Sequence, residues 1–280
     1  MVTAPDEETL VRIPVNGIEI NVTVEGSGEP VVLLHGWPHT WRVWSEVIPE
    51  LAGRHQVLAP DLRGLGDSDR PAGGYDLNTL ADDVLSLLDA HGLRTAHLVG
   101  IDLGAPIAFF TALRDPGRVS RLVLTEGLIG TLPGAENFAP PWWFGFHRVP
   151  GLAETVLPGH EAEYLNWFYR SGTLGRGLPA HIEDAFVRAY SGTEGLRGGF
   201  EHYRAMPGNA SLIADLASKR RLTVPTAVIG GATVGEATAN QVRPLADDLQ
   251  AFRIPDGGHI LPLDRPRELL EIMVPFLGRA

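Results

Sequence analysis

The segment 99–105, with the sequence VGIDLGA, constrains the fold of this chain most strongly. It joins the short apolar run 96–99 to an apolar pattern typical of a helix, so it predicts a strand, a tight turn and a helix. Gly100 and Gly104 lie two residues before and two residues after Asp102. Glycines at these places permit a strained turn and close packing of helix on strand, which lifts the central side chain above the sheet edge. We therefore expect Asp102 at the tip of this turn.

Asp102 at such a turn has the chemistry of a nucleophile. The unpaired N–H groups and the positive dipole end of the following helix favour its ionised carboxylate, which can attack carbon. The serine form of the turn, G-x-S-x-G, matches no segment of the chain, which argues against acyl-enzyme chemistry on serine. On these residues alone, Asp102 as a simple helix N-cap remains the alternative.

Composition narrows the class of protein. With 280 residues, 44% of them hydrophobic, the chain can bury the core of one domain with an insertion, or of two small domains. A net charge of −11 argues against nucleic acid and anionic membranes as partners. The absence of cysteine excludes disulfides and thiolate chemistry. Residues 1–8 are acidic and lack the pattern of an export signal, so we expect a cytoplasmic protein.

The first part of the chain predicts strands. Alternating runs at 10–14 and 18–24, joined by Asn-Gly at 16–17, predict an antiparallel hairpin. The continuous apolar run 31–34 is typical of a central parallel strand buried on both faces. This strand brings the sequence HGWP, residues 35–38, to the carboxyl edge of the sheet, where open parallel sheets bind ligands.

The HGWP turn predicts an oxyanion-binding site. A turn at this edge can point backbone N–H groups into the site, and we assign this role to the N–H groups of Trp37 and Leu103. His35 and His39 do not predict a metal site, because the intervening glycine and proline prevent the helix that would align them. We expect His35 to hold the loop instead.

Strands and helices then alternate, which predicts a doubly wound parallel sheet. Residues 56–59 form a second buried strand, and the turn-rich loop 61–68 carries charges that we expect to brace the turn. A helix is predicted to be capped by Asn78 and to stop at Gly92.

Two further candidates follow later strands. The strand in 121–126 ends on Glu126 and should emerge beside Asp102, where a buried acid can orient a histidine; Glu126 could equally solvate the strand end. His259 lies in a Gly-rich turn after the last strand, 251–254, and is the best base candidate among ten histidines. A purely structural role for His259 is the alternative.

Residues 127–213 interrupt the alternation and are predicted to form a mainly helical lid, or cap domain, inserted into a core of residues 1–126 and 214–280. Aromatic residues cluster at 142–146 and again at 200–204. Such clusters usually belong to a core, but Trp and Tyr also carry N–H and O–H donors that need partners when buried.

Along the chain, the candidate nucleophile Asp102, acid Glu126 and base His259 each follow a predicted strand, and this order is that of the α/β-hydrolase fold. The chain resembles the branch of epoxide hydrolases and haloalkane dehalogenases, which uses an Asp nucleophile, in the motifs Gly100-x-Asp102-x-Gly104, His35-Gly36-Trp37-Pro38 and Gly258-His259. In some members the acid follows the strand after the nucleophile, which matches Glu126. The loop 230–234 lacks an Asp, and Glu236 is the second candidate for the acid.

Within this branch the chain is most similar to epoxide hydrolases. Tyr203-Arg204 resembles their lid Tyr-Arg pair, whose Tyr is the ring-opening acid, and Leu103 stands where haloalkane dehalogenases usually have a halide-binding Trp. The chain departs from the pattern of these epoxide hydrolases at two places. The second lid donor is often His or Tyr, and this chain has Trp142-Trp143 there. A His usually precedes the nucleophile, and this chain has Ile101 there. An indole N–H can donate a hydrogen bond but not transfer its proton.

The resemblance implies an epoxide hydrolase, with epoxide and water as its reactants and without cofactor or metal. The wide aromatic lid favours a bulky hydrophobic or aromatic epoxide, such as one from secondary metabolism, and a xenobiotic or fatty epoxide fits as well. Oligomeric state is not readable from the sequence, and a homodimer is retained as a candidate assembly. The implied catalytic residues are Asp102, Glu126, His259, Tyr203 and Trp143, and the implied substrate-binding residues are Trp37, Leu103 and Trp142. The alternatives are a haloalkane-type dehalogenase, with Trp142 or Trp143 holding halide, and a catalytically silent binding protein.

Overall fold

An eight-stranded sheet forms the centre of the computed structural model, which describes residues 10–278. The strand order is β1-β2-β4-β3-β5-β6-β7-β8. The strands are β1 Leu10–Val15, β2 Ile18–Gly26, β3 Glu29–Leu34, β4 His55–Pro60, β5 Ala96–Ile101, β6 Val119–Thr125, β7 Thr226–Gly230 and β8 Leu249–Arg253. Strands β3 to β8 are mutually parallel, so the predicted α/β class with a mostly parallel sheet is confirmed.

The antiparallel edge is the predicted hairpin. β1 pairs with β2 across a turn in which Asn16 and Gly17 have φ angles of 43° and 81°, and β2 pairs antiparallel with β4. Both turn residues occupy the left-handed region that a type I′ turn requires, which explains the preference for Asn-Gly here.

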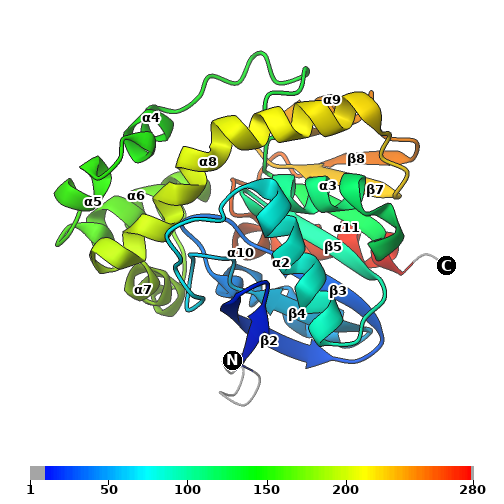
Figure 1. Ribbon diagram of the computed structural model, residues 1–280, viewed down its shortest axis with the longest axis horizontal. Coiled ribbons are helices and arrows are strands. Elements are labelled where there is room, and N and C mark those ends of the chain that lie inside the picture. The colour runs from blue at the N-terminus through cyan, green and yellow to red at the C-terminus, as the bar shows by residue number, and fades with distance from the viewer. Residues whose placement is uncertain (1–9, 279–280) are drawn as a thin grey trace.

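Helices cover both faces of the sheet. α2 (Leu77–Ala90) and α3 (Gly104–Arg114) lie on the near face in Figure 1, and α11 (Pro266–Leu277) lies on the far face. The shorter elements of the core are η2 (Trp41–Trp44), α1 (Ile48–Ala52), η3 (Pro116–Arg118), α9 (Ala237–Val242) and α10 (Leu261–Asp264). The predicted cap of α2 was wrong: Asp76 is the N-cap, since its carboxylate accepts from the Thr79 N–H, and Asn78 lies inside the first turn.

A helical insertion, defined here as residues 127–225, separates β6 from β7. Its helices are α4 (Trp142–Arg148), α5 (Leu152–Val156), α6 (Glu161–Gly172), α7 (Ala180–Ala189) and α8 (Gly192–Lys219). Figure 1 shows α4 to α7 and the first half of α8 gathered beside one end of the core. The second half of α8 contacts α3, so a division at residue 213 falls inside one continuous helix. Buried Ile213 and Ala217 keep this half of α8 on the core.

Within residues 10–278, no helix is both long and apolar enough to cross a bilayer. The acidic residues 1–8, on which the expectation of a cytoplasmic protein rests, lie outside the described part of the chain.

Candidate active site

The turn between β5 and α3 has the predicted strained geometry. Asp102 has a φ of 53°, which is rare for a residue with a side chain. A β-carbon at Gly100 would lie 2.3 Å from the Gly104 carbonyl oxygen, and one at Gly104 would lie 2.2 Å from the Leu34 carbonyl oxygen. Both positions therefore require glycine for helix and strands to pack this closely, and the turn presents the Asp102 carboxylate at the carboxyl edge of the sheet.

Backbone N–H groups hold the Asp102 carboxylate on one side. The Trp37 N–H donates to Asp102 Oδ1 over 2.9 Å, and the Leu103 N–H also hydrogen-bonds the carboxylate. The two N–H groups assigned to oxyanion binding thus both reach the same carboxylate. Gly36 makes this approach possible, because a β-carbon there would lie 2.1 Å from Asp102 Oδ1.

His259 lies between two carboxylates. Its Nε2 is 3.2 Å from Asp102 Oδ2, and its Nδ1 is 3.3 Å from Glu126 Oε2. The three side chains come from the ends of β5, β6 and the loop after β8. The structure therefore brings together the three residues that the sequence selected as nucleophile, acid and base.

The charges in this group control its proton positions. Burial lowers the pKa of His259, but hydrogen bonds and charge interactions with Asp102 and Glu126 outweigh burial and raise the pKa to about 10. Burial raises the pKa of Asp102, but the hydrogen bond and the charge of His259, with smaller contributions from His39 and the Leu103 N–H, outweigh burial, so the net shift is downward. At neutral pH the pair is therefore an imidazolium beside an ionised Asp102.

Glu126 is fixed by the loop after β7. It is 1% exposed, has a φ of 45°, and accepts hydrogen bonds from the backbone N–H groups of Gly231, at 2.5 Å, and Val234, at 3.1 Å. The second candidate for the acid, Glu236, lies at the start of α9 with a 70% exposed side chain, 3.9 Å from Arg253. Of the two, only Glu126 contacts His259.

A cavity of about 850 Å³ opens above Asp102 and His259. Tyr203 of α8, 3% exposed, and Trp143 of α4 both line this cavity. Burial and the charge of Asp102 raise the pKa of Tyr203 well above its usual value, so its hydroxyl stays protonated. Most of the remaining lining is apolar and comes from the insertion, including Leu132, Pro133, Phe138, Phe144, Phe168, Met206 and Ile213.

Trp142 does not line the cavity, in contrast to the substrate-binding role predicted for it. Its side chain is 61% exposed and packs on the outside of α4, with ring centroids 5.9 Å from Trp143 and 6.2 Å from Trp167. Successive residues of a helix point in different directions, so only one of the two tryptophans can face inward. That residue is Trp143.

Sequence reasoning missed a buried polar pair in the insertion. His147 Nε2 is 2.6 Å from the Tyr164 hydroxyl, and the His147 ring packs 4.5 Å from the Tyr203 ring and 4.7 Å from the Trp37 ring. Burial lowers the pKa of His147 to about 3, so this imidazole is neutral. The available signal was its place four residues after Trp143 on α4, which puts both on one helix face.

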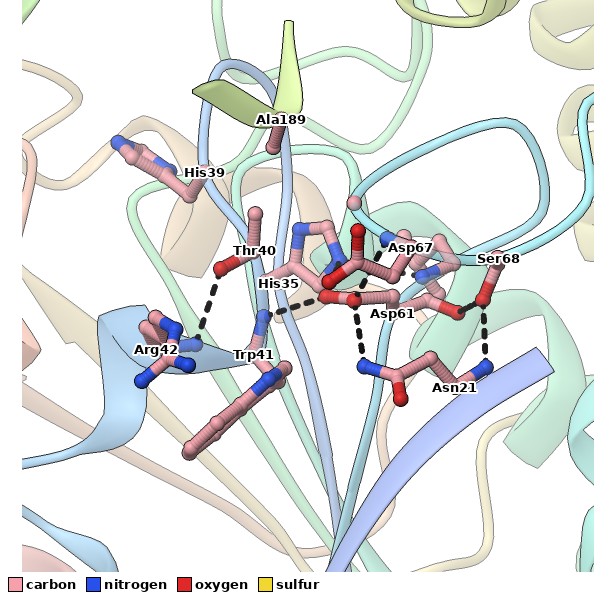
Figure 2. A network of polar contacts seen from close by, with 12 residues as sticks. Asn21, His35, His39, Thr40, Trp41, Arg42, Asp61, Asp67, Ser68 and Ala189 are labelled. Atoms are coloured by element: carbon pink, nitrogen blue, oxygen red, sulfur yellow. Dashed lines mark hydrogen bonds and ion pairs between the residues drawn. The ribbon is translucent and has the colours of Figure 1, made fainter. Parts of the chain in front are cut away.

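His35 has the loop-holding place that the sequence predicted. Its Nδ1 donates to the Gly36 carbonyl over 2.7 Å, and its Nε2 accepts from the Leu62 N–H over 3.1 Å. Figure 2 shows the buried Asp61 beside it, whose carboxylate accepts from Asn21, from the Trp41 N–H and from the Asp67 N–H. Of the charged side chains in the loop 61–68, Asp61 thus ties β2, Trp41 and its own loop together beside this turn, whereas Arg63 pairs with Asp83 of α2.

His39 lines the cavity as well, at a ring-centroid distance of 6.5 Å from His259. Burial lowers its pKa to about 3. In the part of the chain that the structure describes, no group of three or more His, Asp or Glu side chains has the arrangement of a metal site.

Comparisons with known proteins agree with the fold described above. A family model for the alpha/beta hydrolase fold matches residues 29–266. The soluble epoxide hydrolase of Corynebacterium sp. strain C12 is 30% identical, over 94% of this chain and 95% of the relative. Among solved structures, Cfl2 of Burkholderia cenocepacia superposes with a TM-score of 0.89 at 32% identity, over 96% of this chain and 95% of the other. The epoxide hydrolase CorEH superposes with a TM-score of 0.88 at 28% identity, over 96% and 98% of the two chains.

Proposed function

Because this chain belongs to the α/β-hydrolase family, as a hydrolase of its epoxide hydrolase branch, we propose that it opens an epoxide to a vicinal diol through an ester on Asp102. The observation that carries the proposal is the shared cavity: an ionised Asp102 held by two N–H groups faces the same space as the buried phenol of Tyr203. A nucleophile and a proton donor on one cavity are what ring opening requires.

In the first step, Asp102 Oδ2 attacks an epoxide carbon and the C–O bond of the ring breaks. The Trp37 N–H holds Oδ1, and we assign the attack to Oδ2, the oxygen that lies 3.2 Å from His259 Nε2 and keeps a second lone pair for the bond to carbon. Tyr203 gives its proton to the epoxide oxygen as the alkoxide develops, and Trp143 donates a hydrogen bond to the same oxygen. The product of this step is a hydroxyalkyl ester of Asp102.

In the second step, water attacks the ester carbonyl with His259 as the base. Before ring opening, His259 is protonated because Asp102 and Glu126 together raise its pKa to about 10. The ester carries no charge, so its formation removes the Asp102 contribution and lowers the pKa of His259. The imidazolium can then pass its proton to the Tyr203 phenolate or to solvent, and Glu126 keeps the neutral ring aligned.

The oxyanion of the second step forms at Oδ1, within reach of the Trp37 and Leu103 N–H groups. Each such donor can contribute roughly 3 kcal/mol to transition-state stabilisation. The helical insertion acts in this proposal as the cap that supplies Tyr203 and Trp143.

The lining supports a bulky hydrophobic or aromatic epoxide as the substrate. The cavity of about 850 Å³ far exceeds the volume of an epoxide ring, and apolar side chains of the insertion provide most of its wall. The position of Trp142 outside the cavity removes one of the two tryptophans that the dehalogenase alternative offered as a halide donor and leaves Trp143 as the other.

The test is a single turnover in H₂¹⁸O with excess enzyme over a panel of hydrophobic epoxides. The ester route predicts that the first diol contains no ¹⁸O, because its new oxygen comes from Asp102, and that the label appears in the peptide containing Asp102. Label in the first diol would indicate direct attack by water. Absence of diol from every epoxide, with halide release from haloalkanes, would favour dehalogenation.

A further inference from the structure

Two tyrosines of the helical insertion clamp the turn that carries the Trp37 N–H. We infer that Tyr169 and Tyr190 are positioning residues for oxyanion stabilisation in the ester-hydrolysis step. The inference rests on the proposed function, and it assigns the insertion a role beyond the donation of Tyr203.

The turn itself is short and closely fitted to the nucleophile. The His39 N–H donates to the Gly36 carbonyl over 3.0 Å, which closes residues 36–39 into one turn. The Trp37 N–H points from this turn to Asp102 Oδ1. Any rotation of the turn therefore moves the N–H relative to the carboxyl group.

The core holds the beginning of this turn. His35, fully buried, binds the Gly36 carbonyl through Nδ1 and the Leu62 N–H through Nε2. These bonds come from elements of the sheet and its loops, so the N-terminal side of the turn would stay in place without the insertion.

The insertion holds the end of the turn. The Tyr169 hydroxyl of α6 donates to the Pro38 carbonyl over 3.0 Å, and the Tyr190 hydroxyl, at the C-terminus of α7, donates to the His39 carbonyl. Both tyrosines have an exposed fraction of 0%. Two consecutive carbonyl groups of the turn are thus fixed by hydroxyls from two different helices.

The third contact fixes the ring of Trp37. A β-carbon at Gly199 of α8 would lie 2.3 Å from this indole, so the helix backbone lies directly against it. Tyr190 also packs on the indole, with a centroid distance of 6.2 Å. The packed ring is therefore a third restraint on the turn, beside the two carbonyl contacts, and the three together fix the direction of the Trp37 N–H.

The two chemical steps differ in their need for this N–H. During ring opening the carboxylate loses charge, so a hydrogen bond to Oδ1 gives no advantage to the transition state. During ester hydrolysis the same oxygen gains a negative charge, and a donor at the right position stabilises it. Loss of the clamp should therefore slow hydrolysis selectively.

The experiment compares Tyr169→Phe, Tyr190→Phe and the double variant with the wild type. Single-turnover rapid quench, with intact mass for the ester and chromatography for the diol, gives both rate constants. Loss of one hydrogen bond to the turn is expected to slow hydrolysis about fivefold and to leave ring opening within about twofold of wild type. The double variant is expected to lose more and to accumulate ester.

Tyr75→Phe is the matched control. Tyr75 is 4% exposed, and its hydroxyl donates to the Pro71 carbonyl over 2.9 Å, so the substitution also removes a buried bond from tyrosine to a backbone carbonyl. It does not touch the turn 36–39, and the ratio of the two rate constants is expected to stay at the wild-type value. This ratio is a readout that general destabilisation does not change.

The outcomes separate the two proposals. A wild-type enzyme that forms and hydrolyses the ester, with an unchanged ratio in folded Tyr169→Phe and Tyr190→Phe, overturns the clamp and leaves the function standing. A wild-type enzyme that forms no ester overturns the function, and the clamp with it. If one variant fails to fold, the other decides, because each tyrosine makes its own bond to the turn.

Discussion

Asp102 and His259 form an ion pair across 3.2 Å, so nucleophile and base hold each other in their charged forms before substrate arrives. The charge of Asp102 contributes to the raised pKa of His259, and His259 contributes to the lowered pKa of Asp102. Formation of an ester ends this mutual effect. The contact that keeps Asp102 ionised for attack therefore also keeps His259 protonated, so His259 can act as a base only after the ester has formed.

Replacement of His259 by Gln is expected to preserve alkylation of Asp102 and to block hydrolysis of the ester. The Trp37 and Leu103 N–H groups still favour the ionised nucleophile in this variant. Intact-mass analysis after addition of an epoxide should show a stable adduct. His181→Gln, which changes an exposed histidine of α7, should turn over normally. Loss of turnover without any adduct would contradict the assigned role.

Replacement of Glu126 by Gln is expected to lower turnover by about 10²-fold or more, because the base loses its orienting carboxylate. Glu236→Gln should have little effect, since Glu236 is exposed and does not contact His259. Steady-state rates of both variants, with melting curves to compare their folding, provide the measurement. The opposite ranking would transfer the acid role to Glu236.

Replacement of Tyr203 by Phe is expected to slow ring opening at least about 10²-fold, because a proton donor is lost. Trp143→Phe should lose on the order of 10-fold, which corresponds to about 1.4 kcal/mol of hydrogen bonding. Single-turnover rates of Asp102 alkylation measure both effects. A Tyr203→Phe enzyme that alkylates at the wild-type rate would rule out the phenol as the donor.

The raised pKa of His259 predicts how stability depends on pH. Its folded-state pKa of about 10 lies above the usual value of 6.5, so its ion pairs stabilise the fold fully below pH 6.5, and this stabilisation is lost between pH 6.5 and 10. The difference in unfolding free energy between wild type and His259→Gln should therefore shrink from pH 7 to pH 10. Chemical denaturation at both pH values measures it, and a constant difference would disprove the ion pair.

Replacement of Gly36 by Ala is expected to abolish ester formation while the protein stays folded. The new methyl group would lie 2.1 Å from Asp102 Oδ1, so the carboxylate must leave its position beside the Trp37 N–H. Gly73→Ala is the matched control, since a β-carbon there meets nothing within 4 Å. Normal alkylation by a folded Gly36→Ala variant would show that the close contact is dispensable.

The sheet, the hairpin and the turn at Asp102 could be predicted because each depends on local pattern. Apolar runs define the strands, Asn16-Gly17 requires one turn type, and Gly100 and Gly104 require one backbone path. The placement of Glu126 and His259 followed from topology, because parallel strands end at the same edge. Their chemical roles stay predictions.

The contacts of the insertion could not be predicted in the same way. Tyr169 and Tyr190 reach Pro38 and His39 across 131 and 151 residues of chain, and nothing in their local pattern indicates a backbone carbonyl as the partner. The aromatic pair at 142–143 predicted inward donors, but the helix phase that turns Trp142 to solvent depends on packing against α8. Tertiary packing decides these positions.

The continuity of α8 restricts how substrate can enter and product can leave. This helix lies against the Trp37 ring in its first half and contacts α3, so outward rotation of the insertion would have to bend a helix of 28 residues that has Pro207 in its interior. The other connection, residues 127–141, is non-helical and lines the cavity through Leu132, Pro133 and Phe138. The wall of the cavity therefore combines one long helix with a connection that contains Pro133, Pro140 and Pro141 and that no helical hydrogen bonds stiffen.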